Sequence, residues 1–230
     1  MGAWVDDAGM FRTYKHGDGA KVLRDGAGEV VGFSDRDSAA VLAIEIELSF
    51  AGLLDVNKVD GYFAWRTRRA VKQFQAEEGL TADGQVGPIT AQYLFLHRVD
   101  ETERALGIAD HLLFGLLYWE SRFDPGVIAV NPDGSLDRYL AQINDTAHPE
   151  VSEVDAADPT YSIPYAGLRM KKAYDWYVKT CEPRAWDCAV LQHNTPLGAS
   201  KYCAEGVWAT EKNRLYVESV RTAASKFPLS

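Results

Sequence analysis

Apolar residues recur at helical spacing in three stretches between residues 35 and 98. The first stretch ends at Gly52 and the second at Gly79, two glycines placed where a helix commonly stops. Pro88 stands where a third helix would begin, because proline fits the first turn of a helix. Turns rich in Asp-Gly separate the three stretches. The pattern predicts a compact three-helix bundle, small but able to form a core.

From residue 99 onward the pattern is again mostly helical, with one turn-rich interruption. Asp100 and Glu103 have the spacing of a capping box and predict the start of a new helix. The apolar run HLLFGLLYWE predicts a helix that ends at Glu120, and residues 138–143 are expected to form a short strand. Later helices are expected at about residues 163–179, 184–192, 196–204 and 209–226. The fold class is therefore mainly α, with some β structure in a second domain spanning residues 99–230.

Residues 1–34 form short glycine-rich runs that predict a small hairpin and carry no functional signal. The 230 residues have a net charge of −9, which argues against a nucleic-acid-binding protein. The N-terminus lacks the basic and apolar regions of a signal peptide, and no run approaches the roughly 18 apolar residues of a membrane span. We therefore expect a monomer that is made in a cytoplasm, without an export signal of its own and without stable membrane association.

The three cysteines, Cys181, Cys188 and Cys203, leave at least one thiol unpaired, unlike the cysteines of a secreted disulfide framework. A bond between Cys181 and Cys188 is one alternative, but we expect buried thiols. The histidines are scattered and form no metal-binding motif. We therefore predict no metal and no other cofactor, and we do not favour a zinc amidase or a cysteine peptidase.

Glu120 lies where the apolar helix meets a break in the chain at residues 124–126. Burial at the edge of a core raises the pKa of a carboxyl group, which suits a general acid. A glutamate at a helix end is more often a solvated surface residue. The apolar and aromatic residues before Glu120, and the polar loop after it, favour the catalytic interpretation.

A long series of positions in the bundle resembles a known module. The series comprises Asp60, Gly61, Phe63, Thr67, Ala70, Val71, Phe74, Gln75, Gly79, Leu80, Asp83, Gly84, Val86, Gly87, Pro88 and Thr90. It resembles the peptidoglycan-binding domain of many cell-wall hydrolases, although Ala64 departs from the usual glycine of that family. The resemblance implies a shallow groove for wall glycan or stem peptide over residues 35–98. The wall-binding residues that we expect are Tyr62, Phe63, Arg66 and Arg69, although several basic residues on one helix are also typical of a solvated face.

A second resemblance covers most of residues 108–204. Glu120, Ser121, Phe123 and Pro125, then residues 139–144, resemble the transglycosylase and goose-type lysozyme superfamily, in which a helix ends in Glu-Ser and a Gly-Leu-Met-Gln-Ile-like strand follows. Residues 192–194 (Gln-His-Asn) fall on the later Ala-Tyr-Asn element of that family. The sequence departs from the family at Tyr139, at Ala141 and at His193, which replaces a tyrosine. The resemblance implies an α+β lysozyme-like catalytic domain.

The reaction implied is cleavage of the β-1,4 bond between N-acetylmuramic acid and N-acetylglucosamine, with Glu120 as the acid. Asp137 is the better candidate for a second catalytic carboxylate, since Asp133 lies in a plain Asn-Pro-Asp-Gly turn. A hydrolase needs such a second group, whereas a lytic transglycosylase does not, and the sequence leaves both open. The expected substrate-binding residues are Ser121, Asn131, Ser135, Tyr139, Gln142, Asn144, His193 and Asn194.

The two resemblances together imply a bacteriophage endolysin whose partner is bacterial peptidoglycan. Such an enzyme would stay in the host cytoplasm until a holin opens the host membrane. Two alternatives remain: a non-catalytic wall-binding protein with a lysozyme-like fold, and a bacterial autolysin.

Overall fold

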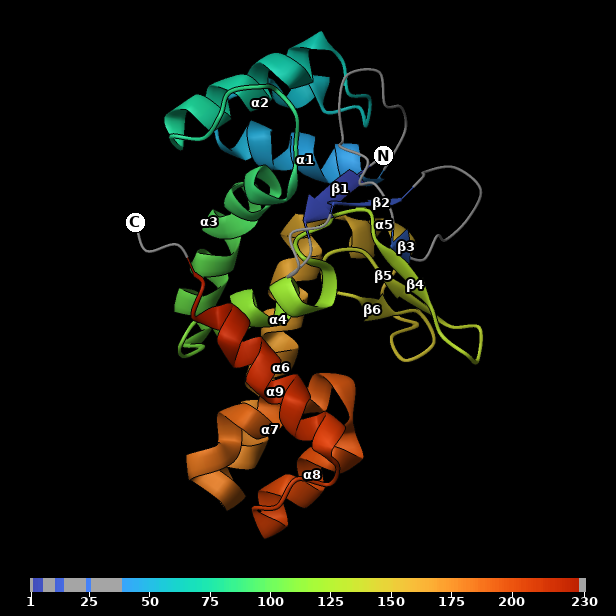
Figure 1. The fold of residues 1–230 in the computed structure, drawn as a ribbon, viewed down its shortest axis with the longest axis vertical. Coiled ribbons are helices and arrows are strands. Elements are labelled where there is room, and N and C mark those ends of the chain that lie inside the picture. Colours follow the sequence, from blue (N-terminus) through green and yellow to red (C-terminus); the bar gives the residue numbers. More distant parts are fainter. Residues whose placement is uncertain (1, 6–10, 15–23, 26–38, 228–230) are drawn as a thin grey trace. The chain divides into compact units, whose positions relative to one another are not determined.

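The computed structural model describes residues 2–5, 11–14, 24–25 and 39–227, and it is mainly helical, as the sequence predicts (Figure 1). In chain order the elements are β1 (Gly2–Val5), β2 (Phe11–Tyr14), β3 (Arg24–Asp25), α1 (Ala39–Phe50), the 3-10 helix η1 (Val56–Lys58), α2 (Trp65–Glu77), α3 (Pro88–Leu106), α4 (Leu112–Ser121), β4 (Ile128–Val130), β5 (Leu136–Arg138), β6 (Ile143–Asn144), α5 (Glu153–Ala157), α6 (Pro159–Cys181), η2 (Glu182–Arg184), α7 (Ala185–Asn194), α8 (Pro196–Glu205) and α9 (Glu211–Ala224).

The chain divides into two compact units, and the divisions fall inside α3, α4 and α6. The first unit comprises Met1–His97 and Glu120–Ser162, and the second comprises Arg98–Trp119 and Ile163–Ser230. The segments 1–34, 35–98 and 99–230 stay a prediction.

In the first unit, α1 and α2 pack together, and the predicted helix ends are confirmed. Gly52 follows α1 and Gly79 follows α2, each with a positive φ (72° and 69°) that glycine adopts at little steric cost. The third helix begins at Pro88, as expected. The core is formed by side chains that are at most 4% exposed: Val41, Ile44, Leu48, Phe63, Phe74, Phe95.

Two three-stranded antiparallel sheets accompany the helices, with strand orders β1-β2-β3 and β4-β5-β6. Within residues 1–34, the β-prone runs at 21–23 and 29–33, on which the predicted hairpin also depends, lie outside the described residues. In the second sheet Asp137 of β5 is paired with Asn144 of β6. The expectation of one continuous strand over 138–143 is wrong, because residues 139–142 form a turn in which Tyr139 and Gln142 have positive φ values of 60° and 46°.

In the second unit, α7 packs against both α8 and α9. Helices α4 and α9 approach closely at Gly115, where an added Cβ would lie 2.3 Å from the carbonyl oxygen of Val220. Only glycine allows this crossing. The core of the unit includes Leu112, Leu113, Phe114, Ile163, Val190 and Leu191, all fully buried.

The expected helix start at Asp100 is also wrong, since α3 continues from Pro88 to Leu106 without a break. Asp100 forms an ion pair with Arg104 on the next turn. Glu103 is 4% exposed and accepts hydrogen bonds from the backbone N–H groups of Leu113 and Phe114, at 2.8 and 3.0 Å. The carboxylate therefore caps α4, the helix that ends at Glu120 and Ser121.

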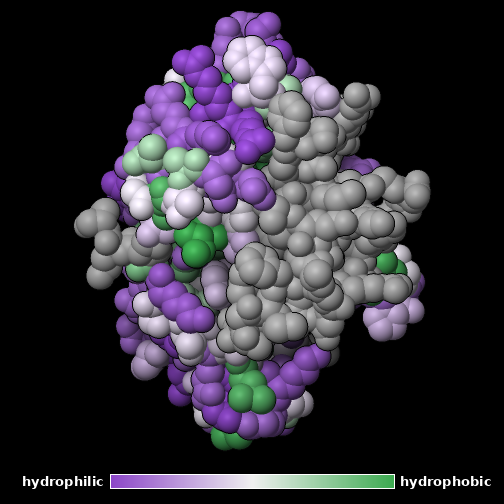
Figure 2. Space-filling view, turned by 45° about the horizontal axis from the view of Figure 1, so that its top comes forward, coloured by the Kyte–Doolittle hydropathy of each residue, from purple (hydrophilic) through white to green (hydrophobic). Residues whose placement is uncertain are grey.

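Hydrophilic side chains predominate among the coloured residues on the face shown in Figure 2, and hydrophobic ones are scattered there. Within the part of the chain that the structure describes, no helix combines the length and the apolar character needed to cross a membrane.

Candidate functional site

Glu120 is the penultimate residue of α4, the helix with the apolar run. Its side chain is partly exposed, while the next residue, Ser121, is 1% exposed. Trp119, on the other side, is 37% exposed. The predicted location of Glu120 at the edge of a hydrophobic helix is therefore confirmed.

The turn that follows Glu120 has an unusual backbone. Arg122 and Phe123 have φ values of 55° and 61°, in the left-handed region that residues other than glycine and asparagine rarely adopt. The ring of Phe123 is fully buried, which anchors the turn in the core. The turn is completed by a hydrogen bond of 2.9 Å from the Gly126 N–H to Oδ1 of Asp124. Such strain is characteristic of functional sites and is maintained by the surrounding structure.

The carbonyl oxygen of Val127 joins this turn to the segment that carries Gln142. It accepts hydrogen bonds from the Tyr139 N–H at 2.6 Å and from Nε2 of Gln142 at 3.3 Å. Nε2 of Gln142 also donates to the carbonyl of Tyr139, at 2.8 Å. The structure thus brings the segment after Glu120 next to the Tyr139–Gln142 turn, and it uses the amide of Gln142 to hold that turn.

Asp137 lies in a hydrogen-bonded cluster with three of the predicted sugar-binding residues. Its Oδ2 accepts from the side-chain amide of Asn131 at 2.9 Å, and its Oδ1 accepts from that of Asn144 at 2.8 Å. Both amides also donate to Oγ of Ser135, at 3.2 and 3.0 Å. These polar groups therefore satisfy one another within the sheet.

Asp133 occupies the turn that the sequence predicts. Its Oδ1 accepts from both Oγ and the backbone N–H of Ser135, at 2.7 and 3.0 Å, and these bonds hold the pKa of the Asp133 carboxyl below its ordinary value. Asp133 therefore stabilises the turn as an ionised side chain.

Tyr139 replaces a residue that is glycine in the resembled family, and its side chain is 5% exposed. Its hydroxyl donates to Glu153 at 3.1 Å. The pKa of Tyr139 is raised to about 12, mainly because the hydroxyl is buried and, to a lesser extent, because Glu153 is negatively charged. The phenol therefore stays protonated at neutral pH and acts as a donor.

His193 and Asn194 end α7 in the second unit, where His193 is partly exposed and Asn194 is exposed. Gln192, just before them, accepts a hydrogen bond of 2.7 Å from the hydroxyl of Tyr177. The described geometry places these residues in the second unit, whereas Glu120 and the Asp137 cluster are in the first.

The four predicted wall-binding residues have different environments. Phe63 is fully buried, so its expected role as a wall-contacting side chain is wrong: the ring belongs to the core of the bundle. Arg66 forms a 3.1 Å ion pair with Asp60. Tyr62 is partly exposed and Arg69 is exposed.

Two buried polar residues shape the loops of the bundle. Oε2 of Glu45 accepts from the N–H groups of Asp60 and Gly61, at 2.9 and 2.8 Å, and its Oε1 accepts from Oγ1 of Thr67 at 2.6 Å. Sequence reasoning missed Glu45, although an acidic residue inside the apolar run LAIEIEL is a signal of a satisfied buried carboxyl.

Gln75 has the same role at the second loop. Its Nε2 donates to Asp83, to the carbonyl of Gln85 and to Thr90, and its Oε1 accepts from the N–H of Gly84 at 2.8 Å. One side chain therefore fixes the whole turn before α3.

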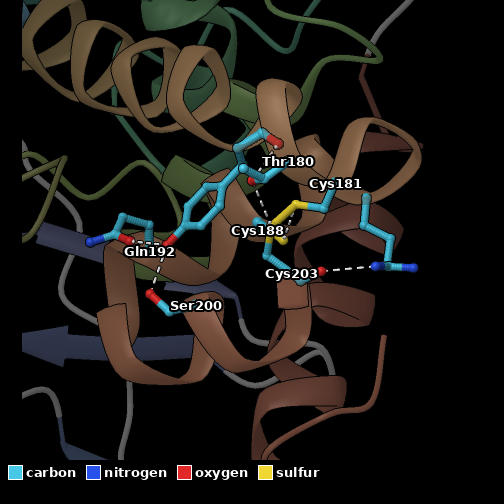
Figure 3. The surroundings of a disulfide bond; sticks show 8 residues. Thr180, Cys181, Cys188, Gln192, Ser200 and Cys203 are labelled. Carbon is cyan, nitrogen blue, oxygen red and sulfur yellow. Dashed lines mark hydrogen bonds between the residues drawn. A yellow bond between two sulfur atoms is a disulfide. The ribbon is translucent and has the colours of Figure 1, made fainter. Parts of the chain in front are cut away.

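The expectation of three buried thiols is wrong for two of the cysteines. Cys181 and Cys203 form a disulfide between the end of α6 and α8, and Cys188 is a free, buried thiol (Figure 3). Burial raises the pKa of Cys188 to about 11. Among the described residues, these three cysteines are the one group of three or more potential metal ligands that lie close together, and the disulfide already occupies two of them.

Comparison with protein families matches residues 37–94 to the family described as "Putative peptidoglycan binding domain". The match falls inside the predicted module, and it supports peptidoglycan as a partner and an association with the cell wall. Comparison with curated proteins finds no match to this sequence.

Proposed function

We propose that the chain is an enzyme that degrades peptidoglycan by cleaving the β-1,4 bond between N-acetylmuramic acid and N-acetylglucosamine. The observation that carries the proposal is the setting of Glu120. This carboxyl is partly exposed at the end of an apolar helix, and a strained turn with Arg122 and Phe123 at positive φ follows it directly. Strained backbone beside a half-buried carboxyl is typical of an active site.

In the proposed mechanism, Glu120 donates its proton to the glycosidic oxygen as the bond to the muramic carbon breaks through an oxocarbenium-like state. Both oxygens of Asp137 accept hydrogen bonds from asparagine amides, and this arrangement fits a structural role better than activation of a water molecule. We therefore favour the lytic transglycosylase variant. The muramic 6-hydroxyl attacks the cation, and the ionised Glu120 takes the hydroxyl proton, so that one carboxyl serves as acid and then as base.

The peptidoglycan-binding domain supplies the second support for the proposal. A domain that binds the polymer raises the effective concentration of a linked catalytic site near its substrate bonds. The combination of a wall-binding domain with a glycan-cleaving site fits a bacteriophage endolysin, and we extend the proposal to lysis of the host bacterium.

The test uses the full chain and Glu120→Gln, a change that keeps the size of the side chain and removes its acid. We expect the wild type to clear a suspension of cell walls and Glu120→Gln to be slower by about two orders of magnitude or more. Both proteins should sediment equally with walls. If both are equally inert and both bind walls, the chain is a non-catalytic wall-binding protein.

The products decide between the two reactions. We expect mass spectrometry of digested walls to show 1,6-anhydromuramic ends, which only the transglycosylase route produces. Reducing muramic ends instead would show hydrolysis and would restore Asp137 as the candidate second carboxylate.

A further inference from the structure

A groove of about 440 Å³ lies in the second unit between α6 and the α7–α8 pair. Its lining from α6 includes Arg169, Lys172 and Trp176, which recur at the helical spacing that places them on one face. Gln192 of α7 and Ser200 of α8 line the opposite wall. The groove is thus an open trough with cationic, aromatic and amide groups.

The two walls of this groove are fixed to each other. The hydroxyl of Tyr177 on α6 donates to Oε1 of Gln192 at 2.7 Å and lies 3.4 Å from Oγ of Ser200. Figure 3 shows these contacts beside the disulfide that joins Cys181, at the end of α6, to Cys203 of α8. A covalent bond and a buried tyrosine therefore fix the positions of the groove walls before any ligand binds. This preorganisation lowers the entropic cost of binding.

The charge of the groove is opposite to that of the whole chain. Its described lining contains two cations, Arg169 and Lys172, and no carboxylate, although the chain has a net charge of −9. The indole of Trp176 is 72% exposed beside them and offers an apolar surface to a ligand. A ligand that suits this lining carries carboxylates for the cations and an aliphatic part for the indole.

We propose that this groove binds the carboxylate-bearing stem peptide of peptidoglycan. The proposal rests on the proposed function for the identity of the polymer. Stem peptides carry free carboxylates on short aliphatic residues, whereas the glycan chain offers the groove mainly neutral hydroxyl and acetamido groups. Gln192 and Ser200 would meet the peptide bonds, and Lys172 would meet a carboxylate. The second unit thereby selects wall strands that still carry their peptides.

The test measures binding of a synthetic stem tripeptide with free carboxylates to the full chain carrying Glu120→Gln, which prevents turnover. Isothermal titration gives the affinity, and the 15N-indole resonance of Trp176, assigned by its loss in Trp176→Phe, reports the location. We expect the peptide to shift that resonance. Lys172→Ala should weaken binding about fivefold, since a charge-assisted contact is lost. Lys212→Ala removes the same charge from an exposed position of α9, outside the groove, and should leave the affinity unchanged.

Three outcomes would overturn the proposal: equal binding of the peptide with amidated carboxylates, a Trp176 shift caused instead by peptide-free glycan or by glycerol phosphate, or no binding at all. Wall clearing by the wild type is measured separately. If walls are cleared but the tripeptide does not bind, only the groove assignment fails. If the tripeptide binds and walls are not cleared, the enzymatic proposal fails and the groove assignment stands.

Discussion

Asn144 donates its side-chain amide to Oδ1 of Asp137 at 2.8 Å, across the antiparallel pair formed by β5 and β6. The other carboxylate oxygen accepts from Asn131 at 2.9 Å. The carboxylate that sequence reasoning assigns to catalysis is therefore the central acceptor of its own sheet. This arrangement makes the role of Asp137 separable by experiment from that of Glu120.

Replacement of Asp137 by asparagine should destabilise the sheet but should have little effect on the rate of wall clearing. An asparagine at this position offers one acceptor oxygen to two donor amides, so we expect the free energy of unfolding to fall by about 1–2 kcal/mol. The clearing rate per folded molecule should stay within about tenfold of the wild type. Denaturant unfolding and wall clearing measure the two quantities.

The double variant Asp137→Asn, Asn144→Asp is the matched control. It restores one acceptor–donor pair across the strands, and the carboxylate at position 144 can still accept from the N–H groups of Thr146 and Ala147, as Asn144 does. We expect it to recover part of the lost stability. A clearing rate reduced by about a hundredfold or more in both variants would assign Asp137 a catalytic role and contradict the one-carboxyl mechanism.

Local signals were sufficient to predict the bundle but not the partners of its polar residues. Gly52, Gly79 and Pro88 mark helix ends because their backbone preferences act within a few residues. The capping-box spacing of Asp100 and Glu103 is also local, yet α3 continues through it, since the tertiary structure uses Glu103 to cap α4 instead. Local spacing carries no information on a partner that arrives from another helix.

In the candidate site, too, local sequence patterns predicted some features and could not predict others. The apolar run predicted the place of Glu120, because the burial of a single helix can be inferred from its consecutive residues. The amides of Asn131 and Asn144 were expected to face sugar, but their choice of Asp137 depends on the register of three strands. The bond between Cys181 and Cys203 likewise depends on how α6 and α8 pack, which cysteine spacing does not specify.

Gly84→Ala should destabilise the peptidoglycan-binding domain. Gly84 has a φ of 75°, and an added Cβ would lie 2.8 Å from Cγ of Arg68 and 2.9 Å from Cγ of Lys72. We expect a loss of about 1–2 kcal/mol from the left-handed backbone, plus the cost of displacing these side chains. Gly79→Ala is the matched control, since its φ is 69° and an added Cβ meets nothing within 4 Å. Equal losses in denaturant unfolding would contradict the steric part of this prediction.

Loss of the disulfide should destabilise the second unit. The bond closes a loop with a sequence separation of 22, for which removal typically costs about 2–4 kcal/mol. We expect the Cys181→Ser, Cys203→Ser variant to unfold at lower temperature than the wild type and to be insensitive to dithiothreitol. Cys188→Ala should keep the reductant sensitivity of the wild type, because Cys188 is outside the bond. Reductant insensitivity of the wild type in thermal scans would refute the prediction.

Glu45 gives the bundle a pH dependence of defined sign. Burial raises the pKa of this carboxyl above its ordinary value of 4.5, and it outweighs the hydrogen bonds from Thr67, Asp60 and Gly61 that lower it. The folded state therefore holds this proton at a pH at which the unfolded chain has released it. Stability from this group is greatest below about 4.5 and declines as pH rises from there through the raised pKa, because ionisation in the folded state takes place in a desolvated site.

The variant Glu45→Gln isolates this contribution. A glutamine can accept from the Asp60 and Gly61 N–H groups with its oxygen and donate to Oγ1 of Thr67 with its amide, so the three contacts of Glu45 are all replaced. We expect the wild type to lose stability relative to Glu45→Gln as pH is raised above about 4.5, in urea unfolding measured at several pH values. Glu77→Gln, at an exposed position of α2, is the control. Its stability should change with pH in the same way as that of the wild type. A wild type that gains stability relative to Glu45→Gln over the same range would mean that the hydrogen bonds outweigh burial at Glu45, and that its pKa is lowered instead.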